Sequence, residues 1–261
     1  MYREMAILRN PAAARAAPGE GGPVAVFARD YPSRHRIAAH AHPTAQLLHA
    51  ASGLMRVTTA AGRWQVPTQR AVWIPAGIEH VVDMEGLVSM RSLYFPPERV
   101  PGLPGPCAVL KVRPFLRALI DEAVTGSFRA AGDPRWAWIS ALVLEELATA
   151  AVEPLFVPMP RDGQLLAVCA ALLEDPGSDR PLEQWADRAG TSPRTLARRF
   201  HGEVGMGFRA WREQARLAEA VSRLNAGAPV GLVAADLGYR SPSAFIAMFR
   251  RNLGCSPGAY R

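Results

Sequence analysis

An internal repeat near the carboxyl end constrains this 261-residue chain more than any other feature. Each copy has a Ser-Pro pair, an apolar residue three positions after the proline and Phe seven positions after it. The copies start at Ser192-Pro193 and Ser241-Pro242, and each follows a glycine, Gly190 or Gly238. Serine before a first-turn proline is typical of a helix start, and glycine is typical of a helix end. The repeat therefore predicts two helix-turn-helix motifs.

In such a motif the second helix enters the major groove of DNA. The apolar residues of the first copy share one helix face, which leaves Arg194, Ala197 and Arg198 on another. An arginine fork can pair with O6 and N7 of guanine, so Arg194 and Arg198 are candidate base-reading residues. Contact with phosphate alone remains the alternative for each. Arg199 is expected to meet phosphate or solvent.

The second copy offers a different outer face, made of Ser243, Ile246 and Ala247. These short side chains can touch thymine methyl groups but cannot make a bidentate contact with a base. The first copy is therefore expected to carry most of the sequence reading. Arg240, Arg250 and Arg251 are expected to position the second copy on the backbone phosphates. The other predicted DNA contacts are Ser192, Thr195 and Ser241.

Residues 164–261 resemble the DNA-binding domain of the arabinose-operon-regulator (AraC/XylS) family of transcription factors. The motifs that carry the resemblance are Ala186-x-x-Ala189-Gly190, Arg216-Leu217-x-x-Ala220, Ala234-x-x-Leu237-Gly238-Tyr239 and Gly254-x-Ser256-Pro257-x-x-Tyr260-Arg261. The resemblance implies that a helix over 208–224 spaces the two reading helices by about one turn of DNA, ~34 Å. Many members carry Arg where this chain has Ala247, which puts base reading by the second copy in doubt. Over the whole chain the pattern resembles the nitroimidazole-resistance-regulator-like subgroup.

The amino-terminal part shows short, closely spaced strands, which predicts a sandwich or small barrel. It contains His40-x-His42, then Gln46 and Gly53, and later Pro75-x-Gly77-x-x-His80. This set resembles the two motifs of the cupins, which implies a double-stranded β-helix barrel with a cavity. Residues two apart on a strand share a face, so His40 and His42 are expected to point the same way.

Three imidazoles and one oxygen donor suit a divalent transition metal such as zinc, iron or nickel. Two departures from the cupin pattern weigh against a metal: Gln46 replaces the usual Glu, and Gln69 stands in place of a leading Gly. The alternative is a polar cluster that lines an effector pocket. The predicted metal or effector pocket is His40, His42, Gln46 and His80, with no certain cofactor.

These patterns divide the chain into five segments. We expect a flexible tail over 1–23, a cupin-like sensor domain over 24–110, a helical element over 111–152, a proline-rich linker over 153–163 and the DNA-binding domain over 164–261. The helical element resembles the dimerisation and linking element of the AraC/XylS family, which implies a homodimer. Within the fourth segment, the prolines between Glu153 and Arg161 argue against a regular element. The predicted fold is a two-domain chain, with a β-barrel followed by helices and then an all-α domain with two helix-turn-helix motifs.

The net charge of +7 suits a polyanionic partner, and no apolar run is long enough for a membrane span. Three widely spaced cysteines and the lack of a signal-like amino terminus favour the cytoplasm. We expect a non-enzymatic, effector-responsive transcriptional regulator that binds double-stranded DNA and a small molecule as a homodimer, without a membrane partner. The alternatives are a metal-dependent cupin enzyme fused to a DNA-binding domain, or a constitutive DNA-binding protein whose barrel is structural.

Overall fold

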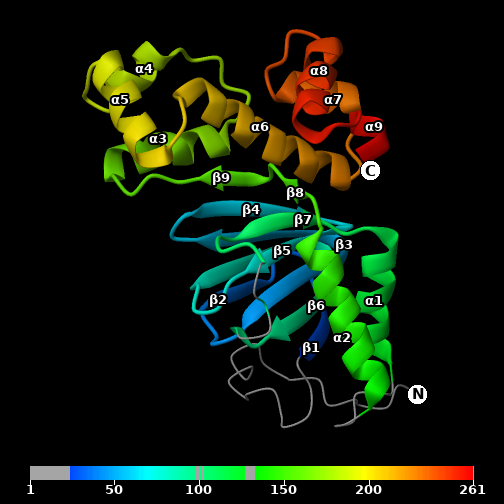
Figure 1. Ribbon diagram of the computed structural model, residues 1–261. Coiled ribbons are helices and arrows are strands. Elements are labelled where there is room, and N and C mark those ends of the chain that lie inside the picture. Colours follow the sequence, from blue (N-terminus) through cyan, green and yellow to red (C-terminus); the bar gives the residue numbers. More distant parts are fainter. Residues whose placement is uncertain (1–23, 98–99, 101–102, 127–132, 261) are drawn as a thin grey trace. The chain divides into compact units, whose positions relative to one another are not determined.

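The computed structural model describes residues 24–97, 100, 103–126 and 133–260, so the predicted tail over 1–23 lies outside it. The chain divides into two compact units (Figure 1). The sheet unit comprises Met1–Thr59 and Val66–Glu153, and the helical unit comprises Ala60–Gln65 and Pro154–Arg261.

The sheet unit is built on antiparallel strands. They are β1 (Ala25–Tyr31), β2 (Arg36–His40), β3 (Ala45–Thr59), β5 (Arg70–Ile74), β6 (His80–Phe95), β7 (Ala108–Lys111) and β8 (Val152–Glu153). Their order is β1-β6-β3-β5-β7-β8, and β2 pairs with the first half of β6. This order does not return to its starting strand. The β-rich domain is confirmed, but the sheet is open and the predicted closed barrel is not confirmed.

A bend in the two longest strands shapes the sheet. The register between β3 and β6 shifts between Ala50 and Ser52 and again between Ser52 and Leu54. Gly53 lies between these shifts with a φ of +79°, and a Cβ at this position would lie 2.3 Å from the carbonyl oxygen of Leu87. Only glycine allows this approach, so Gly53 is required at the irregularity in β3.

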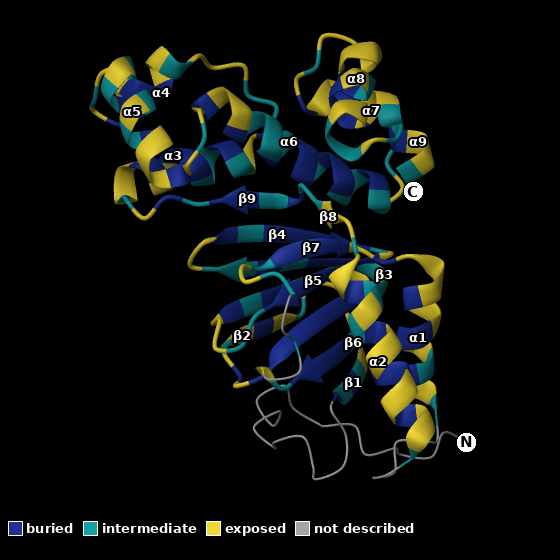
Figure 2. Cartoon of the chain, in the orientation of Figure 1, coloured by how far each residue is buried: buried dark blue, intermediate teal, exposed yellow. Residues whose placement is uncertain are grey.

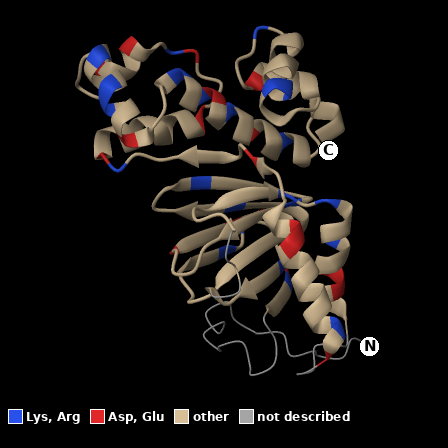
Figure 3. Ribbon diagram, in the orientation of Figure 1, with Lys and Arg blue, Asp and Glu red and all other residues tan. Residues whose placement is uncertain are grey.

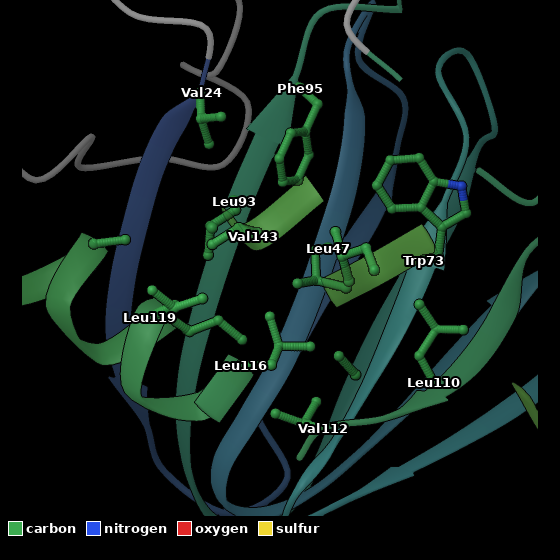
Figure 4. Close-up of a cluster of buried hydrophobic side chains, with 14 of the residues drawn as sticks. Val24, Leu47, Trp73, Leu93, Phe95, Leu110, Val112, Leu116, Leu119 and Val143 are labelled. Carbon is green, nitrogen blue, oxygen red and sulfur yellow. The ribbon is translucent and has the colours of Figure 1, made fainter. Parts of the chain in front are cut away.

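Two helices explain why the sheet need not close on itself. α1 (Pro114–Thr125) and α2 (Pro134–Ala148) cover one sheet face and share its apolar core. Figure 4 shows side chains from both layers meeting in this core: Leu47, Trp73, Leu93, Phe95, Leu116, Leu119 and Val143. Because the helices bury this face, barrel closure is not needed to remove it from water. The strand residues that alternate with these core residues, including Gln46, point to the opposite face of the sheet.

The helical unit confirms the two predicted helix-turn-helix motifs. Its helices are α3 (Gly163–Glu174), α4 (Leu182–Arg188), α5 (Pro193–Val204), α6 (Phe208–Asn225), α7 (Val230–Asp236), α8 (Pro242–Leu253) and α9 (Pro257–Tyr260). Ser192 caps α5 and Ser241 caps α8, each accepting a backbone N–H at 3.2 Å. Gly190 and Gly238 have φ angles of 62° and 74°, as the turn requires. In the part of the chain that the structure describes, no helix is long and apolar enough to span a membrane.

Segment 153–163 contains regular structure despite its prolines. The short strand β9 (Phe156–Pro158) pairs with β4 (Gly62–Pro67). The Trp211 indole N–H donates to the carbonyl of Pro158 at 2.6 Å, and Gln214 donates to that of Pro154 at 2.5 Å. A proline lacks an N–H but keeps its carbonyl as an acceptor, so it can end an edge strand. Much of this predicted linker is therefore held within the helical unit.

Candidate nucleic-acid interface and histidine site

α5 separates its apolar and basic residues onto different faces. Leu196 and Phe200 are fully buried in the core of the helical unit. Figure 2 shows that α5 carries both buried and exposed residues. Arg194 and Arg198 are exposed, and Ala197 between them is half-buried. Figure 3 shows the basic residues that this helix presents. Among the described residues neither Arg194 nor Arg198 has an ion-pair partner, so both guanidinium groups are available to an anionic ligand or a base.

Arg199 differs from its neighbours because its side chain is used inside the protein. It forms a salt bridge with Asp162 and donates a hydrogen bond to Oε1 of Gln164 at 2.9 Å. Asp162 also caps α3, and the hydrogen bond from Leu165 N, with help from Arg199, lowers the pKa of its carboxyl group. This contact ties α5 to the start of α3, so Arg199 does not present a free guanidinium.

The outer face of α8 is short and uncharged. Ser243 and Ala247 are exposed and Ile246 is half-buried. Basic residues lie at both ends of this helix. Arg240 precedes it and Arg250 lies in its last turn, both exposed, while Arg251 is paired with Glu213 at 2.6 Å. The contrast between the two reading helices thus extends from sequence to the folded surface.

Three of the predicted pocket residues come together in the sheet unit. One ring nitrogen from each of His40, His42 and His80 lies within 4.8 Å of the others. The ring centroids of His40 and His80 are 4.3 Å apart, and those of His42 and His80 are 5.3 Å apart. β2 supplies His40 and β6 supplies His80, and the two residues are paired across these strands. Strand pairing therefore brings His40 and His80 together, whereas His42 lies between β2 and β3, outside the strand that was expected to align it with His40.

Backbone carbonyls orient all three rings. The Nδ1 atoms of His40, His42 and His80 lie 2.8, 2.7 and 2.8 Å from the carbonyl oxygens of Ala38, Thr44 and Ile78. A carbonyl oxygen can only accept, so each Nδ1 carries a proton, which leaves Nε2 as the ring nitrogen that could bind a metal ion. Hydrogen bonds of this type are what orient histidines that ligate metals.

His80 is the most deeply buried member of the histidine cluster. It is 1% exposed, and its Nε2 has no hydrogen-bond partner among the described residues. Burial lowers the pKa of His80 to about 4, with smaller effects from His40 and His42. The ring is therefore neutral at physiological pH, with an unused acceptor inside the cluster.

Gln46 joins the cluster through a polar network on β3 and β6. Its Oε1 lies 3.0 Å from Nε2 of His42, and its Nε2 lies 3.0 Å from Oγ of Ser92 and 3.1 Å from the hydroxyl of Tyr94. Turning the amide over would let its nitrogen donate to a neutral His42 while its oxygen accepts from the two hydroxyls. Sequence reasoning missed Ser92 and Tyr94, although their two-residue spacing on a strand places them on one face.

Two family models match separate parts of the chain. An AraC-like ligand binding domain model matches residues 22–134, and a helix-turn-helix domain model matches residues 185–261. The HTH-type transcriptional regulator NimR of Escherichia coli (strain K12) is 33% identical over 221 residues, which cover 85% of this chain and 81% of that protein. The HTH-type transcriptional regulator RipA of Corynebacterium glutamicum is 32% identical over 103 residues, covering 40% of this chain and 31% of that one.

Among solved structures, the DNA-binding domain of the global transcriptional factor AdpA in complex with a target DNA is 37% identical. The match covers 38% of this chain and 90% of that chain, with a TM-score of 0.36. The relative from E. coli extends over both units, and the two family models fall on the sheet unit and the helical unit in that order. The chain therefore belongs to the AraC family of ligand-responsive, DNA-binding transcriptional regulators.

Proposed function

We propose that this regulator reads DNA through two adjacent major grooves and that α5 supplies most of the base recognition. The observation that carries this proposal is the exposure of Arg194 and Arg198 on α5, against the uncharged face of Ser243 and Ala247 on α8. Each well-placed arginine fork discriminates its base by about 1–3 kcal/mol, which methyl contacts cannot match.

The remaining polar groups at the two helix starts fit contacts with phosphate. Ser192, Thr195 and Ser241 lie at the amino-terminal turns of α5 and α8, where backbone N–H groups favour anions. Arg240 and Arg250 are exposed next to the second motif, and Arg251 can join them where its pairing with Glu213 opens. These groups hold the register on the duplex without reading its sequence.

Selection of bound duplexes from a random pool by the full-length protein tests this division. We expect two recurring blocks at one spacing, with high information content in one block and low content in the other. Substituting Arg198 should alter the strong block only. Footprinting on the organism's own genomic DNA, at a stated salt concentration, then identifies the operator. The proposal would be contradicted if substitutions in α8, rather than in α5, changed the block with high information content.

We also propose that the sheet unit senses its effector at the histidine cluster, on a cupin-like scaffold. The support is the convergence of His40, His42 and His80, each ring fixed through its Nδ1. The donor set suits a divalent transition metal ion, because three imidazoles that carry their protons on Nδ1 are ligands that such ions accept through Nε2. The unpartnered Nε2 of His80 is the atom that most needs such a ligand.

Calorimetric titration of the full chain with zinc or nickel chloride tests the metal. We expect one site per chain that is lost in His80→Asn and kept in His35→Asn, a half-buried histidine outside the cluster. Absence of binding in the unchanged protein would exclude the metal. In that case His42→Ala should still abolish the response of DNA binding to an effector while sparing basal binding, because the cluster would then contact the effector directly.

We propose a sensing role rather than a catalytic one, because the relatives reported above are named as transcriptional regulators. A cytoplasmic location suits this role, and the three free cysteines agree with it. We further propose that the chain forms a homodimer through α1 and α2. Phe115, Trp138 and Leu142 on these helices are 52%, 67% and 43% exposed, and apolar side chains of this size favour a protein partner.

A further inference from the structure

The loop between α3 and α4, residues 175–181, is held by two arginines of α6. Arg212 donates to the carbonyl oxygens of Arg180, at 2.8 Å, and of Ser178. Arg216 donates to the carbonyl oxygen of Pro176 at 2.7 Å and to that of Ser178 at 3.0 Å. Four charge-assisted hydrogen bonds thus fix the backbone of a loop that contains no regular structure. We call this segment the brace loop.

The brace loop also touches the turn of the second helix-turn-helix motif. A Cβ at Gly177 would lie 2.2 Å from the carbonyl oxygen of Asp236, and one at Gly238 would lie 2.4 Å from the carbonyl oxygen of Gly177. Two backbones therefore meet here with no room for a side chain on either. At Gly190, the equivalent of Gly238 in the first motif, an added Cβ would meet nothing within 4 Å. The contact is specific to the second motif.

Arg216 links the brace loop to the core of the second motif. Its guanidinium carbon lies 5.7 Å from the ring centroid of Tyr239, within the range of a cation–π contact. Tyr239 in turn packs edge-on against Phe245 of α8, with 5.4 Å between ring centroids. The Arg216 side chain thus contacts both the backbone of the brace loop and Tyr239, which packs against α8.

We propose that the brace loop, Arg216 and the Gly177–Gly238 contact form a strut that fixes α8 relative to α5. Apart from the strut, the second motif is attached to α6 by the short connection between α6 and α7 and by side-chain contacts such as that of Glu213 with Arg251. The strut adds an attachment to the first motif's own α3–α4 loop, so the second motif is held by two elements. Arg216 and Gly177 are then positioning residues that set the spacing between the two DNA blocks.

The inference rests on two-groove reading, and its test uses the full chain. Gly177→Ala and Arg216→Ala are compared with Gly231→Ala, a substitution in α7 where an added Cβ meets nothing within 4 Å. We expect the unchanged protein and Gly231→Ala to select two blocks at one spacing from random duplexes. Gly177→Ala and Arg216→Ala should select the same blocks over a broadened range of spacings.

Binding constants give the second readout. On the duplex with the selected spacing, Gly177→Ala and Arg216→Ala should bind roughly ten-fold more weakly, because the second motif is no longer held ready to bind. On a duplex with the α5 block alone, both should bind as the unchanged protein does. A merely structural role would weaken both duplexes alike.

Both variants are first checked for folding by circular dichroism. If Arg216→Ala does not fold, the single variant Arg216→Lys replaces it and is tested beside the single variant Gly177→Ala. Folded variants that keep the single spacing and the original affinity would overturn the strut. Selection of only one block by the unchanged protein would instead overturn two-groove reading itself, and with it the strut.

Discussion

Arg198 and Arg199 are adjacent in sequence but differ in what their side chains can do. Arg198 is exposed without an ion-pair partner among the described residues, whereas Arg199 is held by Asp162. From this difference we expect Arg198, and not Arg199, to read bases.

This difference predicts opposite effects for two neighbouring alanine substitutions. Arg198→Ala should cost about 1–3 kcal/mol of binding at one base pair and relax specificity there. Arg199→Ala should leave specificity unchanged and lower the free energy of unfolding by less than about 1 kcal/mol, because its salt bridge is partly exposed to solvent. Titration of matched and single-mismatch duplexes, with urea unfolding alongside, separates the two. Equal losses on matched and random DNA for Arg198→Ala would exclude base reading.

His49 gives a second prediction for a single residue. It is fully buried on β3, and burial lowers its pKa below 6.5, ahead of opposing effects such as its hydrogen bond to the Arg70 carbonyl. Below pH 6.5, His49 binds a proton in the unfolded chain but stays unprotonated in the folded protein. Stability is therefore expected to fall as the pH drops below about 6.5.

His49→Asn should remove this part of the pH dependence, because an asparagine can keep a donor near the Arg70 carbonyl and cannot titrate in this range. The measurement is the free energy of unfolding as a function of pH, compared as slopes between the two proteins. An unchanged slope in His49→Asn would show that His49 contributes nothing to acid sensitivity.

Among the helices, the two helix-turn-helix motifs share their capping and differ in their surroundings. Both second helices begin at a capping serine, and both turns use a glycine with positive φ. Of these two turns, the one in the second motif is packed against another backbone segment, through Gly238 and Gly177. The two copies of the repeat therefore agree in local geometry but not in packing.

A matched pair of glycine substitutions tests this difference in stability. Gly190→Ala should cost about 1–2 kcal/mol, the penalty for a left-handed conformation at a residue with a Cβ. Gly238→Ala should cost more, since its Cβ would also meet the carbonyl oxygen of Gly177. Urea unfolding of both variants provides the comparison, and equal losses would show that the contact adds nothing to stability.

For the molecule in its entirety, a homodimer through α1 and α2 predicts a concentration-dependent mass. Trp138→Glu places a charge on the most exposed of the three apolar side chains of these helices and should shift sedimentation velocity toward the monomer. Leu232→Glu is the control, because Leu232 is 54% exposed on α7 of the helical unit. A chain that sediments as a monomer at every concentration, or that responds equally to both substitutions, would contradict this interface.

Much of the helical unit could be predicted from sequence because its signals are local. The Ser-Pro starts, the turn glycines and the burial of Leu196 and Phe200 each depend on residues within about two helical turns. The histidine cluster was also predictable in part, from the resemblance of its motifs to those of the cupins; the expected strand alternation does not apply, because His42 lies beyond the end of β2. Ser92 and Tyr94, the hydrogen-bond partners of Gln46, lie on β6. The pairing of β6 with β3 cannot be predicted from the sequence of either strand alone.

The amino-acid order was enough to predict the two helix-turn-helix motifs and their unequal outer faces, because periodicity, capping and side-chain chemistry act over short distances along the chain. The family was predicted from the resemblance of the quoted motifs. Three features could be identified only in the tertiary structure: the open sheet covered by α1 and α2, the salt bridge between Asp162 and Arg199, and the close backbone contact between Gly177 and Gly238. Each depends on which distant segments pack together, and that choice is made by all the buried surfaces at once.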